Sequence, residues 1–231
     1  MTDEHSSSTE GVDDRSGYRQ IRFLRPRDAT EIVLVRHGES AVAYPDEPFP
    51  LLEGHGDPPL APEGRAQAER VADRLAGSEI AAIYVTNLRR TGETAAPLAR
   101  LTGLVPREEA DLREVHLGEW EGGLYRQKVL ESDPLARKMF ETERWDTVPG
   151  AESNEAFAAR LTRGVSRIAS EHRGERVVVF SHGGAIGMIL ALATGARAFS
   201  FTALDNAAIS TLVVSPERWV VRSFNDAAHL E

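Results

Sequence analysis

The chain has 231 residues, which is enough for one domain with a sizeable apolar core. Its 36 acidic and 27 basic residues give a formal charge of −9, which argues against a general binder of nucleic acid or anionic membranes. The absence of cysteine excludes disulfides, thiolate catalysis and cysteine-ligated zinc or iron–sulfur sites. No stretch approaches the roughly 18 apolar residues of a membrane span, and the polar first residues do not resemble a signal peptide. We therefore expect a cytoplasmic protein with no membrane and no nucleic-acid partner.

The start of the chain is polar and acidic, so residues 1–28 are predicted to form a disordered tail that precedes a single domain over residues 29–231. Residues 32–35 (IVLV) form an apolar run without polar alternation, which is typical of a strand buried on both faces. This run ends abruptly at the polar residues 36–40 (RHGES). The proline-rich residues 44–60 predict a loop.

Helices and buried strands alternate through the rest of the chain. Pro62 suits a helix start, which predicts a helix over residues 63–75, and Thr86 with Asn87 is predicted to cap another helix. The further predicted strands are residues 80–85, a short strand near Val105, and residues 176–180, 207–214 and 218–224. The further predicted helices are residues 88–101, 124–142, 153–172 and 185–194, with a glycine- and tryptophan-bearing loop at residues 112–123.

This alternation predicts a three-layer α/β/α sandwich with a mainly parallel central sheet. In such sheets ligands bind beyond the carboxyl ends of the strands. Polar residues follow three of the predicted strands, namely Arg36-His37, residues 86–90 and Ser181-His182. We expect these three segments to meet at one pocket although they lie far apart in sequence.

A single histidine after a strand is more often a packing or surface residue. Two His, two Arg and one Glu together at strand ends and adjoining loops instead favour a catalytic site. Phosphoryl transfer requires positive charge and hydrogen-bond donors around the transferring group. Arg36 and Arg90 each offer paired N–H donors to phosphate oxygens, and His182 adds another. Gly183 and Gly184 allow the backbone to approach an anion at the start of a helix.

The same chemistry needs a nucleophile and an acid. His37 requires a ring nitrogen lone pair to attack phosphorus, and neighbouring arginines favour its unprotonated form. The leaving alkoxide needs a proton, for which Glu114 is the candidate donor.

Residues 35–40 (VRHGES) resemble the R-H-G signature of the histidine phosphatase superfamily, the phosphoglycerate mutase-like group. Other segments resemble further family motifs in the same order: residues 54–60 with Gly64 and Gln67-Ala68, residues 86–94, residues 112–122, residues 149–153 and residues 181–184. R-H-G alone recurs often by chance, whereas this ordered set does not. The resemblance implies a phosphoglycerate mutase-like fold for most of the chain.

The resemblance also implies roles for single residues. It makes His37 the nucleophile and phosphohistidine, and Glu114 the proton donor. It makes Arg36, Arg90, His182, Gly183 and Ser40 the substrate-binding residues, and it implies neither metal nor organic cofactor. The family's L-x-R spacing selects Arg90 over the adjacent Arg89, and the Asn that often follows the signature has no counterpart in residues 41–45.

Other candidates have ordinary explanations. His55 and His116 lie in predicted loops, where solvated histidines are common, and a zinc site built with them is disfavoured by the nearby arginines. Trp120 and Trp145 are expected to pack, although either would also suit a substrate cover. Glu39 is expected to orient a neighbour rather than act as a second acid, and Glu119 and Glu121 are expected to be exposed.

Three functions remain open. The segment 118–122 (GEWEG) resembles the form found in the phosphatase branch of the family rather than the mutase branch. We therefore predict a phosphatase that acts on a small phosphorylated metabolite or another phosphomonoester. A mutase would need basic residues after Glu114 for a second anionic group, and residues 115–150 supply candidates: Arg126, Lys128, Arg137, Lys138 and Arg144. A binding module without catalysis would be expected to have lost one of the five central residues, and none is lost. The oligomeric state stays open, a homodimer included.

Overall fold

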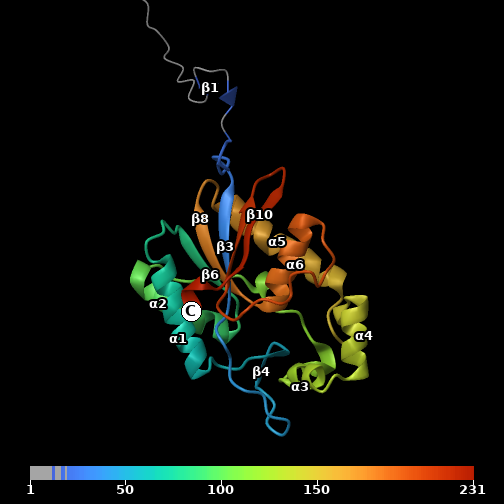
Figure 1. Ribbon diagram of the computed structural model, residues 1–231. Helices are drawn as coiled ribbons and strands as arrows, with labels where there is room; N and C mark the ends of the chain where they lie inside the picture. The colour runs from blue at the N-terminus through green and yellow to red at the C-terminus, as the bar shows by residue number, and fades with distance from the viewer. Residues whose placement is uncertain (1–11, 14–16, 19) are drawn as a thin grey trace, which may run out of the picture.

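The computed structural model describes residues 12–13, 17–18 and 20–231 (Figure 1). The predicted disordered tail therefore falls largely on residues outside this set, and the division of the chain at residue 28 stays a prediction. Val12–Asp13 (β1) pairs antiparallel with Gly17–Tyr18 (β2). Residues 20–28 carry neither strand nor helix and lead into the central sheet.

The central sheet has six strands in the order β10-β9-β3-β8-β6-β7. Their bounds are Thr30–Arg36 (β3), Ala82–Val85 (β6), Arg107–Glu108 (β7), Arg176–Ser181 (β8), Ile209–Val214 (β9) and Trp219–Asp226 (β10). β3, β8, β6 and β7 run parallel, whereas β9 and β10 are antiparallel additions at one edge. The predicted mainly parallel sheet is confirmed, and the short strand expected near Val105 lies two residues further on.

Two pairs of helices cover the two faces of this sheet (Figure 1). Helices α1 (Pro62–Leu75) and α2 (Arg89–Thr102) pack on one face, and α5 (Asn154–Glu171) and α6 (Gly183–Thr194) on the other. β3 serves both cores, since Val33 and Val35 join the α1–α2 side while Ile32 and Leu34 join the α5–α6 side. This two-sided burial explains the uninterrupted apolar run and confirms the three-layer sandwich.

The predicted single helix over residues 124–142 is wrong. The structure has two helices there, α3 (Leu124–Leu130) and α4 (Pro134–Thr142). Ser132 adopts a φ of 54°, and the Asp133 carboxylate accepts a hydrogen bond from the Leu135 N–H at 2.8 Å. Pro134 cannot continue a preceding helix because it lacks the N–H, but it suits the first turn of a new one. The Asp-Pro pair is the sequence signal for this break.

The predicted cap of α2 by Thr86 and Asn87 is also wrong. The N-cap position is Leu88, which offers no capping side chain. Instead the Asp57 carboxylate accepts a hydrogen bond from the Arg89 N–H at 2.8 Å, which satisfies an N–H left free at the helix start. Asp57 follows a small hairpin of β4 (Leu51–Leu52) and β5 (His55–Gly56) inside the predicted loop. The cap therefore ties this loop to α2.

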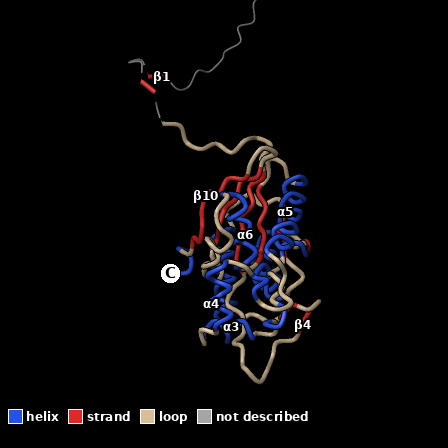
Figure 2. Tube along the Cα trace, turned by 90° about the vertical axis from the view of Figure 1, so that its right-hand side faces the viewer, coloured by secondary structure: helices blue, strands red, loops and turns tan. Residues whose placement is uncertain are grey.

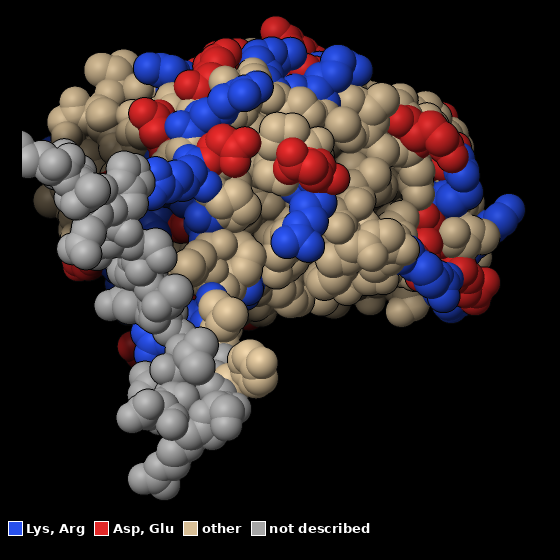
Figure 3. Space-filling view, turned by 90° about the horizontal axis from the view of Figure 1, so that it is seen from above, with Lys and Arg blue, Asp and Glu red and all other residues tan. Residues whose placement is uncertain are grey.

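Short 3₁₀ helices complete the chain: Ala110–Leu112 (η1), Gly118–Trp120 (η2), Trp145–Thr147 (η3) and Ala228–Leu230 (η4). Figure 2 shows residues 20–28 leaving the sheet at the end opposite to α3 and α4. On the face at that end, acidic and basic side chains lie interspersed (Figure 3). Within the described part of the chain, no helix combines the length and apolar character needed to cross a membrane.

Candidate active site

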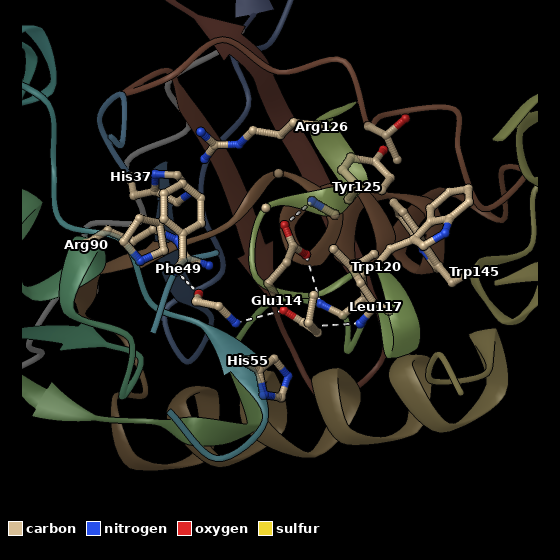
Figure 4. Close-up of a pocket in the computed structure, with 18 of the residues that line it drawn as sticks. His37, Phe49, His55, Arg90, Glu114, Leu117, Trp120, Tyr125, Arg126 and Trp145 are labelled. Carbon is tan, nitrogen blue, oxygen red and sulfur yellow. Dashed lines mark hydrogen bonds between the residues drawn. The ribbon is translucent and has the colours of Figure 1, made fainter. Parts of the chain in front are cut away.

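A cavity of about 450 Å³ opens at the carboxyl ends of the parallel strands. His37 and Arg90 lie on one side of it, Trp120 and Trp145 lie on the opposite side, and Glu114 lies between them (Figure 4). The predicted site residues that line the cavity are Arg36, His37, Arg90, Glu114 and Gly183. Ser40 and His182, which the sequence also predicted, are not among its lining residues.

The R-H-G loop is held on three sides. The His37 N–H donates to the Ser181 carbonyl at 2.9 Å, and the Gly38 N–H donates to Thr94 Oγ1 at 3.0 Å. The Asn206 side chain donates to the His37 carbonyl at 3.1 Å. A Cβ on Gly38 would lie 2.4 Å from the Gly64 carbonyl oxygen, so the signature glycine is required for the close approach to α1.

His37 is poised as a nucleophile by its tautomer. Its Nδ1 lies 2.7 Å from the Gly38 carbonyl oxygen, which only accepts, so Nδ1 carries the proton and Nε2 carries the lone pair. Burial, followed by the charges of Arg90 and Arg36, lowers the pKa of His37 well below its usual value of 6.5. The ring is therefore neutral near pH 7, as attack on phosphorus requires.

His182 lies fully buried behind His37, with the two ring centroids 5.2 Å apart. Its Nε2 is 3.0 Å from Thr86 Oγ1, and its buried Nδ1 has no hydrogen-bond partner among the described residues. Burial first and Arg90 second lower the pKa of His182 well below its usual value. His182 thus supports the His37 ring from behind, and its direct contact with phosphate stays a prediction.

The two predicted phosphate-binding arginines come from different elements. Arg36, at the end of β3, donates to the Leu204 carbonyl and keeps a buried Nε without a partner. Arg90, in the first turn of α2, donates to the Gly56 carbonyl at 2.8 Å. Burial lowers the pKa of Arg90 to about 10, which still leaves it charged near pH 7. Arg89 is exposed and pairs with Glu93 at 3.1 Å, as the choice of Arg90 over Arg89 predicted.

Glu114 is held at the N-terminus of α6. One carboxylate oxygen accepts from the Gly184 N–H at 3.1 Å, and the other accepts from the N–H groups of Ala185 at 3.1 Å and Val115 at 3.0 Å. A Cβ on Gly184 would lie 2.5 Å from Glu114 Oε1, so the missing side chain is what lets the carboxylate dock here. The Gly183-Gly184 pair therefore positions the candidate acid as well as the helix start.

Gly184→Ala is expected to lower kcat by about tenfold or more, because the new methyl group displaces the Glu114 carboxylate and small shifts of a reacting group are costly. Phosphate release from a phosphomonoester measures this. Gly92→Ala is the control, since Gly92 lies within α2 and an added Cβ meets nothing within 4 Å. Equal activity of the two variants would contradict a positioned Glu114.

Arg160, on α5, was not predicted and holds the segment that presents Glu114. Its guanidinium donates to the carbonyls of Asp111, Arg113 and Glu114 at 2.9, 2.8 and 2.7 Å. It also forms two hydrogen bonds of 2.8 Å with the Glu152 carboxylate. Residues 149–153, which contain Glu152, were recognised as a family-like segment in the sequence, but the pairing of Glu152 with Arg160 was not predicted.

Two further residues line the cavity: the exposure predicted for Glu121 is wrong, and Arg126 was predicted only as one of several basic candidates. Glu121 was expected to be exposed, yet it lines the cavity and accepts from the Gly56 N–H at 2.7 Å and the Leu117 N–H at 2.8 Å. Arg126 also lines the cavity, and its guanidinium points toward the side where His37 lies (Figure 4). Lys128 and Arg144, two other basic residues of this region, do not line the cavity. Lys128 pairs with Asp133, and Arg144 pairs with Asp146 and Glu155.

His55 and His116 form an edge-to-face pair with ring centroids 5.0 Å apart, and His55 lines the cavity. The His116 ring accepts a hydrogen bond from the Gly118 N–H at 3.1 Å. In the part of the chain that the structure describes, no group of three or more His, Cys, Asp or Glu side chains is arranged to hold a metal ion. His55 therefore forms part of the wall of the cavity, and His116 packs against it from outside the lining residues.

Comparison with known proteins decides the family. The model of the histidine phosphatase superfamily, branch 1, matches residues 32–227, which include all five central site residues. The chain belongs to this superfamily. The predicted family and the predicted class of enzyme, a phosphatase, are both confirmed.

This histidine phosphatase is 35% identical over 208 residues to phosphoglycerate mutase-like protein 4 of Arabidopsis thaliana, with 88% of each chain covered. It is 34% identical to the metal-independent phosphoserine phosphatase of the same plant, covering 88% of this chain and 84% of that protein. The native structure of mycobacterial glucosyl-3-phosphoglycerate phosphatase superposes with a TM-score of 0.70 at 29% identity, over 86% of this chain and 100% of that one. The histidine phosphatase thus resembles enzymes whose names describe both hydrolases and mutases.

Proposed function

We propose that this histidine phosphatase hydrolyses phosphomonoesters through a phosphohistidine on Nε2 of His37. The hydrogen bond from Nδ1 to the Gly38 carbonyl carries the proposal, because it leaves the lone pair on Nε2. Arg36 and Arg90 line the same cavity as His37, and after burial their charges lower the pKa of the ring. The cavity beside them holds the substrate.

In the first step the Nε2 lone pair forms a bond to phosphorus while the bond to the leaving oxygen breaks. The charge that develops on the phosphoryl oxygens is stabilised by Arg36 and Arg90, both buried where such interactions are strong. Glu114 gives its proton to the leaving alkoxide. In the second step the Glu114 carboxylate takes a proton from water, the water oxygen bonds to phosphorus, and the bond to Nε2 breaks.

Glu114 accepts three N–H hydrogen bonds, from Val115, Gly184 and Ala185. They hold its carboxyl group in the wall of the cavity, where it can reach the leaving oxygen of a bound phosphomonoester.

The substrate class we propose is a small phosphorylated metabolite. A cavity of about 450 Å³ suits a small ligand. Its wall opposite His37 includes Trp120 and Trp145, which offer apolar surface to the alcohol portion. Two relatives are named for phosphoserine and glucosyl-3-phosphoglycerate, both small phosphomonoesters.

The direct test is release of phosphate from p-nitrophenyl phosphate in the presence of a metal chelator. We expect turnover, and we expect a rapidly quenched reaction to contain protein-bound phosphate that is stable in base and labile in acid, as phosphohistidine is. Turnover abolished by the chelator would contradict the metal-free reaction. Absence of turnover on every phosphomonoester would instead support a binding module.

Glu114→Gln is expected to slow substrates with poor leaving groups by roughly 10² to 10⁴, the usual contribution of a general acid. p-Nitrophenyl phosphate is expected to lose less, because its leaving phenolate needs little protonation. The measurement is kcat/KM on an alkyl phosphate and on the nitrophenyl ester. Equal losses on both would count against Glu114 as the acid.

A phosphoglycerate mutase-type isomerase is the second candidate. It is favoured by relatives named probable phosphoglycerate mutase, one of them 29% identical over 208 residues, and by the presence of a basic residue, Arg126, in the cavity. Incubation of 3-phosphoglycerate with 2,3-bisphosphoglycerate separates the two functions. Efficient isomerisation without net phosphate release would replace hydrolysis as the proposed reaction.

A further inference from the structure

Three arginines face the cavity, although the sequence predicted only two of them as phosphate ligands and gave Arg126 as a candidate for a second anionic group. Arg36 comes from the end of β3, Arg90 from the start of α2, and Arg126 from α3. Among the described residues, none of the three pairs with a carboxylate within 4 Å, whereas Lys128 next along α3 pairs with Asp133 at 3.0 Å. Guanidinium groups that share a cavity repel one another, so an arrangement of this kind is stable when an anion enters it.

Arg126 is oriented by the R-H-G loop itself. Its Nη2 donates to Ser40 Oγ at 2.7 Å and its Nη1 donates to the Ala41 carbonyl at 2.8 Å. The guanidinium also lies over the Phe49 ring, 5.4 Å from its centroid. Three of its five N–H donors remain available for a ligand. The residue is exposed, and these hydrogen bonds fix its guanidinium a few residues from the nucleophile.

The charge of Arg126 reaches the reacting atoms. Burial is the largest cause of the low pKa of His37, followed by Arg90 and Arg36, and Arg126 adds a smaller lowering. Desolvation first and the charge of Arg36 second lower the pKa of Arg126. Two predicted ligands, Ser40 and His182, do not line the cavity, whereas Arg126 does. Ser40 has a different partner, since its hydroxyl accepts from Arg126.

We propose that Arg126 is a third phosphoryl-binding arginine, which Ser40 orients. This inference rests on the proposed function and adds a catalytic residue to it. Arg126 donates to an equatorial phosphoryl oxygen, and its positive charge stabilises the transfer to and from His37. The phosphoryl site is therefore completed by α3, and Ser40 acts through the arginine as a positioning residue.

Arg126→Met is the main test, because Met keeps an apolar stem and removes every donor. We expect kcat/KM to fall by about 10² to 10³ on p-nitrophenyl phosphate, glycerol phosphate and 3-phosphoglycerate alike, as for loss of one oxyanion donor. The inhibition constant of inorganic phosphate is expected to rise by about tenfold to a hundredfold. Arg126→Lys should recover part of both losses because it restores the charge without the paired donors.

Arg137→Met is the matched control. Arg137 is exposed on α4 and does not line the cavity, so its replacement should leave all three kcat/KM values unchanged. Thermal melts check folding, and Arg126→Met should melt close to the wild type since the residue is exposed. A loss confined to 3-phosphoglycerate would show that Arg126 reads a carboxylate on the leaving group and would overturn the proposal. An unchanged inhibition constant for phosphate would overturn it as well.

The role of Ser40 is tested by a double-mutant cycle. Ser40→Ala should cause a smaller loss than Arg126→Met, and the double variant should be no worse than Arg126→Met alone. Losses that multiply would show that Ser40 acts independently of Arg126. If the wild type turned over no phosphomonoester, the proposed function would fail, yet calorimetric binding of inorganic phosphate to wild type and Arg126→Met would still test the arginine.

Discussion

Replacing His37 with alanine is expected to lower phosphomonoester turnover by a factor on the order of 10⁴ or more, because loss of the nucleophile removes the covalent route altogether. The proposed nucleophile is Nε2 of this buried ring, which keeps its lone pair because Nδ1 is committed to the Gly38 carbonyl. Residual activity would come from the arginines alone. The measurement is steady-state kcat together with the yield of acid-labile, base-stable phosphoprotein, which should vanish.

The His37→Ala variant needs a check that its site survives. Inorganic phosphate should still bind to it, because Arg36 and Arg90 are supported by contacts to Leu204 and Gly56 that do not involve the imidazole. A melting temperature near that of the wild type and retained phosphate binding would confirm that only the nucleophile is missing. Normal phosphoprotein formation in this variant would place the nucleophile elsewhere.

Replacing Arg160 with methionine is expected to destabilise the protein by about 3–5 kcal/mol, the usual effect of removing one partner of a buried ion pair. Only 10% of the Arg160 side chain and 16% of the Glu152 side chain are exposed, so the remaining carboxylate would be left buried without its partner. The carbonyls of Asp111, Arg113 and Glu114 would also lose their donor. For a chain of this size the melting temperature should fall by about 10 °C.

Arg163→Met on the same helix is the matched control. Arg163 pairs with Asp111 at 3.2 Å, but 59% of its side chain is exposed, so its removal should change stability by no more than about 1 kcal/mol. Arg160→Met should also slow poor leaving groups more than p-nitrophenyl phosphate, because the displaced carbonyl belongs to Glu114. Melting curves that coincide for the two variants would contradict the bracing role of Arg160.

The parts of the fold that the sequence predicted correctly are those set by local pattern. The apolar runs over residues 32–35, 80–85 and 176–180 became β3, β6 and β8 because both sides of each strand are buried. The polar residues that follow these strands converge because parallel strands end at one edge of a sheet. Arg36 and His37 were predicted to lie at the pocket for this reason, whereas Arg90 was selected over Arg89 by the family's L-x-R spacing.

The residues that were missed depend on contacts between distant segments. Arg126 was predicted only as one of five basic residues that could hold a second anionic group, and its place beside the R-H-G loop depends on contacts with Ala41 and Ser40, 85 and 86 positions away, that no spacing rule reports. Glu121 accepts a hydrogen bond from the Gly56 N–H, 65 positions away in the sequence. Arg160 donates to carbonyls nearly 50 positions away. The one missed feature with a local signal is the Asp-Pro pair that ends α3.

The β4–β5 hairpin, through Gly56 and the following Asp57, connects the α2 helix with the cavity wall that contains Glu121. Its Gly56 carbonyl anchors Arg90, its Gly56 N–H anchors Glu121, and the next residue, Asp57, caps α2. The wall that selects the alcohol and the arginine that holds the phosphoryl group thus share one short stretch of backbone. A change in this loop that admits a new alcohol is therefore also expected to move the proposed phosphoryl site. Substitutions here should change substrate specificity and kcat together.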